Sequence, residues 1–303
     1  MIEAPADHSA QVTDRPAGYV LPGDEIAQRA IAALDEHRYP DVDLLLAEIP
    51  RETPIQRAWG LYLDARLGID RTEFEDATAF LTESAVLALT SAHGYEDVVD
   101  GDAMRLAALV FQKLGWIRRR RDDPDHAYRT HRAAMALREA HGSIEEMWET
   151  AVSLGIDADL GRRFAEGRRW HRRAVDLGSE SSKEPDKKRG IALTNLAASL
   201  TDSGDHTAAV EAAQRAREAW TAHDVSGVAV PKADMNLGFA LLKQGEALHD
   251  TDRATAATAL TNARSLLGDA REALTAFGGD HAADARWCDE QIDFAERLLA
   301  TLE

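Results

Sequence analysis

Two histidines stand at corresponding places in the chain, close in sequence to acidic residues. His131 begins the run His-Arg-Ala-Ala and His171 begins His-Arg-Arg-Ala, and Asp157, Asp159 and Asp176 lie nearby. Imidazole and carboxylate groups together can bind a metal or carry out acid–base catalysis. A residue that recurs at one position of a repeat usually packs against its neighbours, so we interpret both histidines as packing residues.

The sequence contains none of the motifs that assemble a catalytic site from a few neighbouring residues. It has no His-Glu-x-x-His, no Gly-rich phosphate loop and no Gly-x-Ser-x-Gly. The single cysteine, Cys288, excludes an internal disulfide and a Cys-based zinc site within one chain. We therefore expect no catalytic residue, no metal and no cofactor. A concealed active site around His131 and His171 is left open as the alternative.

Arginines gather in two stretches that could hold an anion. The first is the continuous run from Arg118 to Arg121, and the second comprises Arg162, Arg163, Arg168, Arg169, Arg172 and Arg173. A continuous run wraps a full turn of a helix, so only one or two of its members can face a ligand. A helix C-terminus also favours cations without any ligand. We interpret both groups as mainly solvated surface charge, with phosphate or nucleic-acid binding as the alternative.

Two asparagines offer a different chemistry. Asn195 precedes Leu196, and Asn236 precedes Leu237 at the corresponding place 41 residues further on. A carboxamide offers one acceptor and two donors, enough to hold a peptide unit in both directions. The alternative is that each asparagine bonds its own neighbouring helix.

These residues belong to helix hairpins that repeat every 40 to 42 residues. The register mark is a leucine followed by a small residue, at Leu114-Gly115, Leu154-Gly155, Leu196-Ala197 and Leu237-Gly238. Small residues follow 13 and 20 positions later, at Ala127 and Ala134, Gly167 and Ala174, and Ala209 and Ala216. In the fourth copy this pair slides to Ala256 and Ala263, which implies an insertion of about six residues after Gly245. A small hairpin cannot bury both faces alone, so the copies must stack.

At these positions the chain resembles the tetratricopeptide repeat family, whose usual period is about 34 residues. The longer period is similar to that of kinesin light chains and bacterial peptide-sensing regulators. The matching residues span roughly 108–267 of the chain. The resemblance implies an all-α fold, a right-handed superhelical solenoid of antiparallel helix hairpins. It also implies a concave groove, lined by the first helix of each hairpin, where Asn195 and Asn236 hydrogen-bond the backbone of a bound peptide.

Outward positions of the first helices supply the other groove candidates. Lys113, Trp116 and Arg120 come from the first clear repeat, and Lys232 and Phe239 from the fourth. The rings would supply apolar contact, and the cations would meet acidic side chains of a partner. Ordinary packing between hairpins is the alternative for both rings.

The pattern predicts a flexible tail at residues 1–22 and a single solenoid domain at residues 23–303. Degenerate repeats occupy residues 23–100, the four clearer repeats residues 103–277, and a capping helix residues 284–302. We also expect a solvated polar loop from Gly178 to Lys188 and a break in the last long helix at Gly268.

The net charge of −18 is unevenly distributed. Residues 101–190 hold 19 Lys and Arg against 15 Asp and Glu, a balance of +4, which leaves −22 for the remainder. Phosphate repulsion from the acidic flanks makes nucleic acid an unfavourable partner. The N-terminus lacks the features of a signal peptide, and no apolar run is long enough to span a bilayer, so we expect a cytoplasmic protein with no membrane partner.

We therefore expect a non-catalytic scaffold that holds a protein or peptide segment, acidic segments included, in its groove. A ligand- or peptide-responsive regulator is the first alternative, although the first hundred residues contain no clear helix-turn-helix with a basic recognition helix. An enzyme built on the same scaffold is the second. A homodimer through the final helix is left open.

Overall fold

The computed structural model describes residues 25–92, 101–223 and 227–302, and all regular secondary structure in this part of the chain is helical. This part forms thirteen α-helices and one short 3₁₀ helix, and no strand occurs within it. The chain divides into two compact units, residues 1–146 and 147–303. The expected all-α class is confirmed, while the predicted tail at residues 1–22 lies outside the described residues.

In the first unit, successive helices pair as hairpins. The helices are α1 (Glu25–Asp35), α2 (Tyr39–Glu48), α3 (Pro54–Asp70), α4 (Phe74–Ala92), α5 (Gly101–Arg120) and α6 (Pro124–His141). Helix α3 contacts both α1 and α5, whereas α2, α4 and α6 make no contacts with one another within the described ranges. The first helices of the hairpins therefore form one layer, and the second helices are separated by them.

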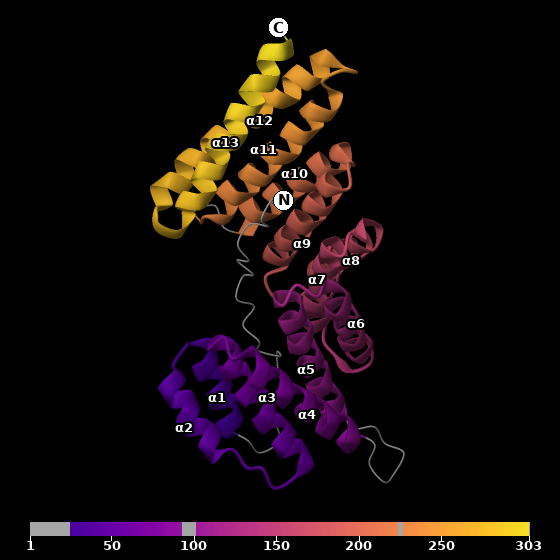
Figure 1. Cartoon of the computed structure of the whole chain (residues 1–303), viewed down its shortest axis with the longest axis vertical. Coiled ribbons are helices and arrows are strands. Elements are labelled where there is room, and N and C mark those ends of the chain that lie inside the picture. The colour runs from indigo at the N-terminus through magenta and orange to yellow at the C-terminus, as the bar shows by residue number, and fades with distance from the viewer. Residues whose placement is uncertain (1–24, 93–100, 224–226, 303) are drawn as a thin grey trace. The chain divides into compact units, whose positions relative to one another are not determined.

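The second unit repeats this arrangement. It contains most of α7 (Ile144–Leu160), then α8 (Phe164–Glu180), α9 (Pro185–Asp202), α10 (His206–His223), α11 (Ala229–Leu248), α12 (Arg253–Phe277), a 3₁₀ turn (Gly279–His281) and α13 (Ala282–Leu302). Helix α11 contacts both α9 and α13, and α13 packs mainly on α12 (Figure 1). We call α1, α3 and α5 of the first unit, and α9, α11 and α13 of the second, the first-helix layer of each unit.

Glycines allow the two helices of a hairpin to approach closely. A Cβ atom on Gly115 would lie 2.5 Å from the His131 ring, and one on Gly155 would overlap the His171 ring. Both histidines are fully buried. They therefore pack against the glycine of the register mark, as the sequence indicates.

The fourth hairpin is longer than the others, mainly because of its second helix. Helix α12 has 25 residues, more than any other described helix, whereas α11 has 20, as many as α5. Ala256 and Ala263 are fully buried on α12, at the contact with α11. A second glycine on α11, Gly245, makes room for Leu260, as Gly238 does for Leu267. The added residues therefore extend the close contact between the two helices.

Two local expectations are wrong. The segment expected to be a polar loop is mostly helical, because α8 continues to Glu180 and α9 begins at Pro185. Proline is well suited to the first turn of a helix, where its missing N–H costs no hydrogen bond. Helix α12 also runs without a break through Gly268. A single glycine lowers helix stability by only about 1 kcal/mol, which the packing of α12 outweighs.

Candidate functional site

The two candidate asparagines lie on neighbouring helices of the first-helix layer. Asn195 is on α9 and Asn236 is on α11, and both side chains are half-buried. Neither side chain forms a hydrogen bond with another described residue. Two carboxamides, one repeat apart, therefore keep their donors and acceptors available.

The helix period explains why these asparagines are only half-buried. Leu193, Leu196 and Leu200 follow a helical spacing and are buried in the second unit. Asn195 lies one residue before Leu196, about 100° around the helix from it. The apolar stripe thus fixes the rotation of α9 and leaves the amide at the edge of the core. Asn236 has the same place beside the buried Leu237.

The other two candidates of the second unit are engaged with the last helix. The Lys232 ammonium lies 3.1 Å from the Asp284 carboxylate, and both side chains are mostly buried. The Phe239 ring packs edge-to-face on Trp287, with 5.2 Å between centroids. Both Asp284 and Trp287 belong to α13. Lys232 and Phe239 thus help to attach α13 to α11.

The candidates in the first unit lie on α5. The Trp116 ring meets Phe74 of α4 edge-to-face, with 6.0 Å between centroids. The Arg120 guanidinium lies over the Trp116 ring, 5.0 Å from its centroid. Lys113, one turn earlier, is half-buried. Trp116 and Arg120 therefore have partners within the chain before any ligand binds.

The run from Arg118 to Arg121 is also partly used in packing. The Arg118 guanidinium donates to the Thr130 hydroxyl and to the His126 carbonyl oxygen, both on α6. Together with the stacking of Arg120, these bonds tie the end of α5 to its own hairpin. Two of the four arginines, Arg118 and Arg120, are therefore engaged within the unit.

A polar network in the second unit joins three helices; the sequence indicated that Asp159 is near His171 but not that Ser199 takes part. Asp159, near the end of α7, accepts a 2.8 Å hydrogen bond from the Ser199 hydroxyl and lies 2.9 Å from Nε2 of His171. Ser199 and His171 are buried. The carboxylate lies between the hydroxyl and the imidazole, so the histidine cannot act as a base on the serine. The spacing of 40 residues between Asp159 and Ser199, one repeat period, was the available signal.

The end of α9 adds a further carboxyl group beside this network. Burial raises the pKa of Asp202, and the negative charge of Asp159 raises it further. Asp202 is the last residue of α9, where the helix dipole also disfavours a negative charge. This end of the first-helix layer is therefore acidic.

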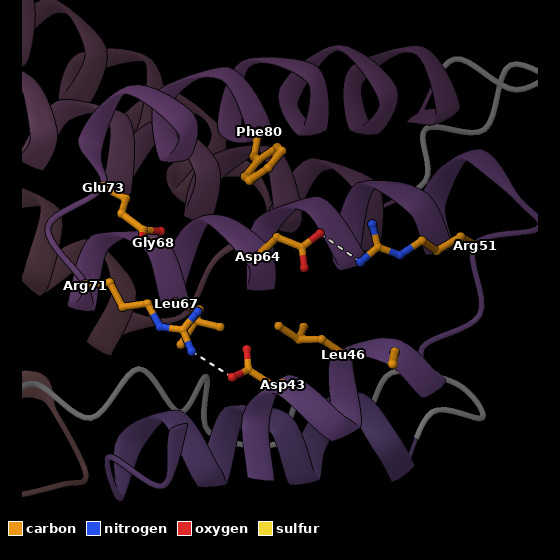
Figure 2. Close-up of a pocket in the computed structure, with 10 residues that line it drawn as sticks. Asp43, Leu46, Arg51, Asp64, Leu67, Gly68, Arg71, Glu73 and Phe80 are labelled. Carbon is orange, nitrogen blue, oxygen red and sulfur yellow. Dashed lines mark hydrogen bonds and ion pairs between the residues drawn. The ribbon is translucent and has the colours of Figure 1, made fainter. Parts of the chain in front are cut away.

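The first unit contains an open cleft of about 470 Å³ between α2, α3 and α4 (Figure 2). Its lining residues are Asp43, Leu46, Ala47, Arg51, Asp64, Leu67, Gly68, Arg71, Glu73 and Phe80. Two ion pairs cross it, Arg51 to Asp64 and Arg71 to Asp43, each at 2.7 Å. Its two guanidinium groups are thus paired with its own carboxylates. No residue singled out from the sequence lies in this cleft.

The described residues contain neither the side-chain arrangement of a metal site nor a helix that could span a membrane. No group of three or more His, Cys, Asp and Glu side chains among these residues has the arrangement of a metal site. No helix there combines the length and apolar character needed to cross a membrane.

The arrangement of hairpins defines a helical repeat protein, and solved structures share it. No family model and no curated protein sequence matches the chain. The TPR-like repeats of a putative kinesin light chain from Podosopora anserina match with a TM-score of 0.54 at 13% identity, over 72% of this chain and 98% of that one. The chain therefore has a tetratricopeptide-like fold, as expected from the sequence.

Two bacterial proteins match over a larger share of this chain. The apo form of the quorum sensor NprR from B. thuringiensis gives a TM-score of 0.58 at 11% identity, over 90% of this chain and 68% of that one. Aspartyl phosphate phosphatase F from Bacillus subtilis gives 0.56 at 10% identity, over 90% and 69%. Identities this low indicate a common fold and leave function to the chain's own residues.

Proposed function

We propose that the chain binds a peptide or protein segment along the first-helix layer of its second unit, through Asn195 and Asn236. The observation that carries this proposal is the pair of half-buried amides, one repeat apart, without hydrogen bonds to other described residues. Neither amide is among the buried polar atoms without a partner in the described structure, so a ligand backbone would take the place of water at both. A protein named a quorum sensor shares the fold, which is consistent with a binding function.

The spacing of the two helices suits an extended chain. Packed helices lie about 8–10 Å apart, and an extended peptide advances about 3.3–3.6 Å per residue. Asn195 and Asn236 would therefore hold peptide units about three residues apart. Side chains on the ligand between these points would face the apolar and polar residues of α9 and α11.

The other residues predicted to line the groove would add contacts to the ligand, but not all of them are available. In the second unit, Lys232 and Phe239 would contact ligand side chains, and Lys113, Trp116 and Arg120 remain candidates for a ligand of the first unit taken by itself. Because Lys232 is already paired with Asp284, an acidic ligand would have to compete for its charge. Backbone recognition by the two amides, rather than charge, is therefore the centre of the proposal.

A displayed peptide library, selected on the immobilised full chain, tests this function. The tightest peptide is then titrated by calorimetry against the chain and against the double variant Asn195→Ala/Asn236→Ala. We expect a loss of about 10- to 100-fold in affinity, since two amides contribute several net hydrogen bonds. Asn262→Ala is the matched control, because Asn262 is exposed on α12, away from this layer. An unchanged affinity in the double variant would contradict the assignment.

The same site could serve a sensor, in which binding changes the conformation of the chain. A neighbour of the same fold is named a quorum sensor, which favours this as the second candidate. Small-angle scattering of the chain with and without the selected peptide distinguishes the two. A change in the radius of gyration supports a sensor, and an unchanged curve supports a scaffold.

The proposed function is non-catalytic. The hydroxyl, carboxylate and imidazole of Ser199, Asp159 and His171 stand in an order that does not activate the serine. Asp159 also fills the space beside Gly167, where a Cβ atom would overlap the carboxylate. This network is better explained as a link between neighbouring hairpins.

A further inference from the structure

Helix α8 carries three neighbouring arginines on its exposed face. Arg169, Arg172 and Arg173 have the i, i+3 and i+4 spacing that brings side chains together on one side of a helix. All three are exposed, and none forms an ion pair with another residue in the described ranges. The opposite face of α8, with His171 and Ala174, is buried. We call these three residues the arginine stripe.

Two acidic residues of α8 stand at a helical spacing to the stripe without forming an ion pair with it: Glu166 precedes Arg169 by three residues, and Asp176 follows Arg172 by four. Glu166 pairs with Arg163, at 3.6 Å, and Asp176 forms no ion pair with the stripe. The neighbouring Arg168 is used inside the unit, where it donates a 2.7 Å hydrogen bond to the Ser203 hydroxyl. The three charges of the stripe therefore remain directed to solvent.

The spacing of the three arginines among themselves does not stabilise α8. Like charges at this spacing destabilise a helix, and the stripe lies in the middle of α8, where the helix dipole offers cations no benefit. The run on α5 differs, because it lies at a helix end and Arg118 and Arg120 have partners within the chain. What sets the stripe apart is that three exposed guanidinium groups lie together without an ion pair to another described residue, and such groups are available to an anionic ligand.

We propose that the arginine stripe docks an acidic peptide segment of a partner protein. A guanidinium group offers two parallel N–H donors to a carboxylate, and three of them on one turn fit two or three acidic side chains. This surface is on a second helix of a hairpin, so it is separate from the amides of α9 and α11. The chain would thus bind one segment through amides and another through charge.

The net charge of the chain favours a short acidic segment over a long polyanion as the partner of the stripe. The net charge is −18, although residues 101–190 carry a positive balance, so a long polyanion would meet repulsion on either side of the stripe. A short acidic segment avoids that repulsion. Its association would also be strongly dependent on salt, since the contacts are exposed.

A fluorescein-labelled peptide of twelve residues with alternating Glu and Gly is the probe, and anisotropy with the full chain is the measurement. We expect saturable binding at 50 mM salt, lost when Gln replaces Glu in the peptide. The variant Arg169→Gln/Arg172→Gln/Arg173→Gln should bind at least tenfold more weakly. The matching Arg→Lys variant keeps the charge without the paired donors, so its affinity should be intermediate.

A charge-matched control separates the stripe from the overall field. Arg129→Gln/Arg132→Gln/Arg215→Gln removes the same charge from exposed arginines that have no ion pair in the described structure, and it should change affinity less than threefold. Asn195→Ala/Asn236→Ala should bind the acidic probe normally, so this proposal and the proposed function can fail separately.

Four results would overturn the proposal. They are equal weakening in the stripe variant and the control, absence of binding up to millimolar peptide, tighter binding of a 20-base-pair DNA duplex at 150 mM salt, and self-association that depends on the stripe in sedimentation.

Discussion

Gly155 lies where α7 crosses α8, and its missing side chain makes room for the His171 ring. We predict that Gly155→Ala destabilises the chain by about 1–3 kcal/mol, because the added methyl group would have to displace a buried ring. Urea unfolding followed by circular dichroism measures the change.

Gly268 on α12 provides the control, since nothing lies within 4 Å of a Cβ atom placed there. Gly268→Ala should stabilise the chain by up to about 1 kcal/mol through helix propensity alone. If both substitutions stabilise, the close contact between α7 and α8 is wrong.

Asp202 gives a prediction about pH. Burial and the charge of Asp159 raise the pKa of Asp202 in the folded chain, so the folded state loses stability as pH rises from the ordinary aspartate pKa of about 3.9 through the raised value. Asp202→Asn should therefore raise the midpoint of thermal unfolding at pH 7. The gain should shrink at pH 3.5, because the raised pKa leaves less of the Asp202 carboxyl ionised in the native chain there. An equal gain at both pH values would point to another cause.

At the residue scale, the sequence predicted packing better than it predicted binding. Recurrence at one repeat position correctly marked His131 and His171 as packing residues, because a repeat conserves its internal contacts. It could not reveal that Lys232 meets Asp284, since that partner lies 52 residues away on a helix outside the repeat pattern. Whether a side chain is free to contact a ligand depends on such partners. Whether it is buried follows from the helical period of the sequence.

At the scale of elements, α13 is held to α11 and α12 by its own buried stripe. Cys288 lies on this stripe and is fully buried, and burial raises the pKa of its thiol to about 12. We predict that Cys288 reacts slowly with a disulfide reagent at pH 8, because only the thiolate is reactive. The reaction should accelerate to the rate of free cysteine in 6 M guanidinium. Rapid labelling of the native chain would show that α13 detaches readily.

Most helices could be predicted because hydrophobic period and turn residues agree along the chain. Gly204 follows the C-cap of α9 with a φ of +81°, the left-handed conformation for which glycine is favoured at a helix end. The errors arose where a breaker residue is compatible with helix, at Pro185 in a first turn and Gly268 within a long packed helix. At such residues tertiary packing decides whether the helix continues, and the neighbouring residues in the sequence do not indicate it.

At the scale of the whole molecule, the excess of acidic residues sets the response of the chain to salt. With a net charge of −18, mutual repulsion destabilises the folded chain at low ionic strength. We predict that raising NaCl from 20 to 300 mM increases the midpoint of thermal unfolding, because the screening length falls from about 20 Å to about 6 Å. Differential scanning calorimetry measures this, and a falling midpoint would indicate that ion pairs outweigh repulsion.

The glycine and the ring that it accommodates belong to the same hairpin, as Gly115 with His131 and Gly155 with His171. Duplication of the DNA that encodes one hairpin therefore copies both the glycine and the histidine of this contact. Such a gene can gain whole hairpins without a compensating substitution elsewhere. An insertion within a unit is more constrained. In the fourth hairpin α12 has 25 residues against 20 in α11, and the longer helix also packs on α13, which gives it a second neighbour.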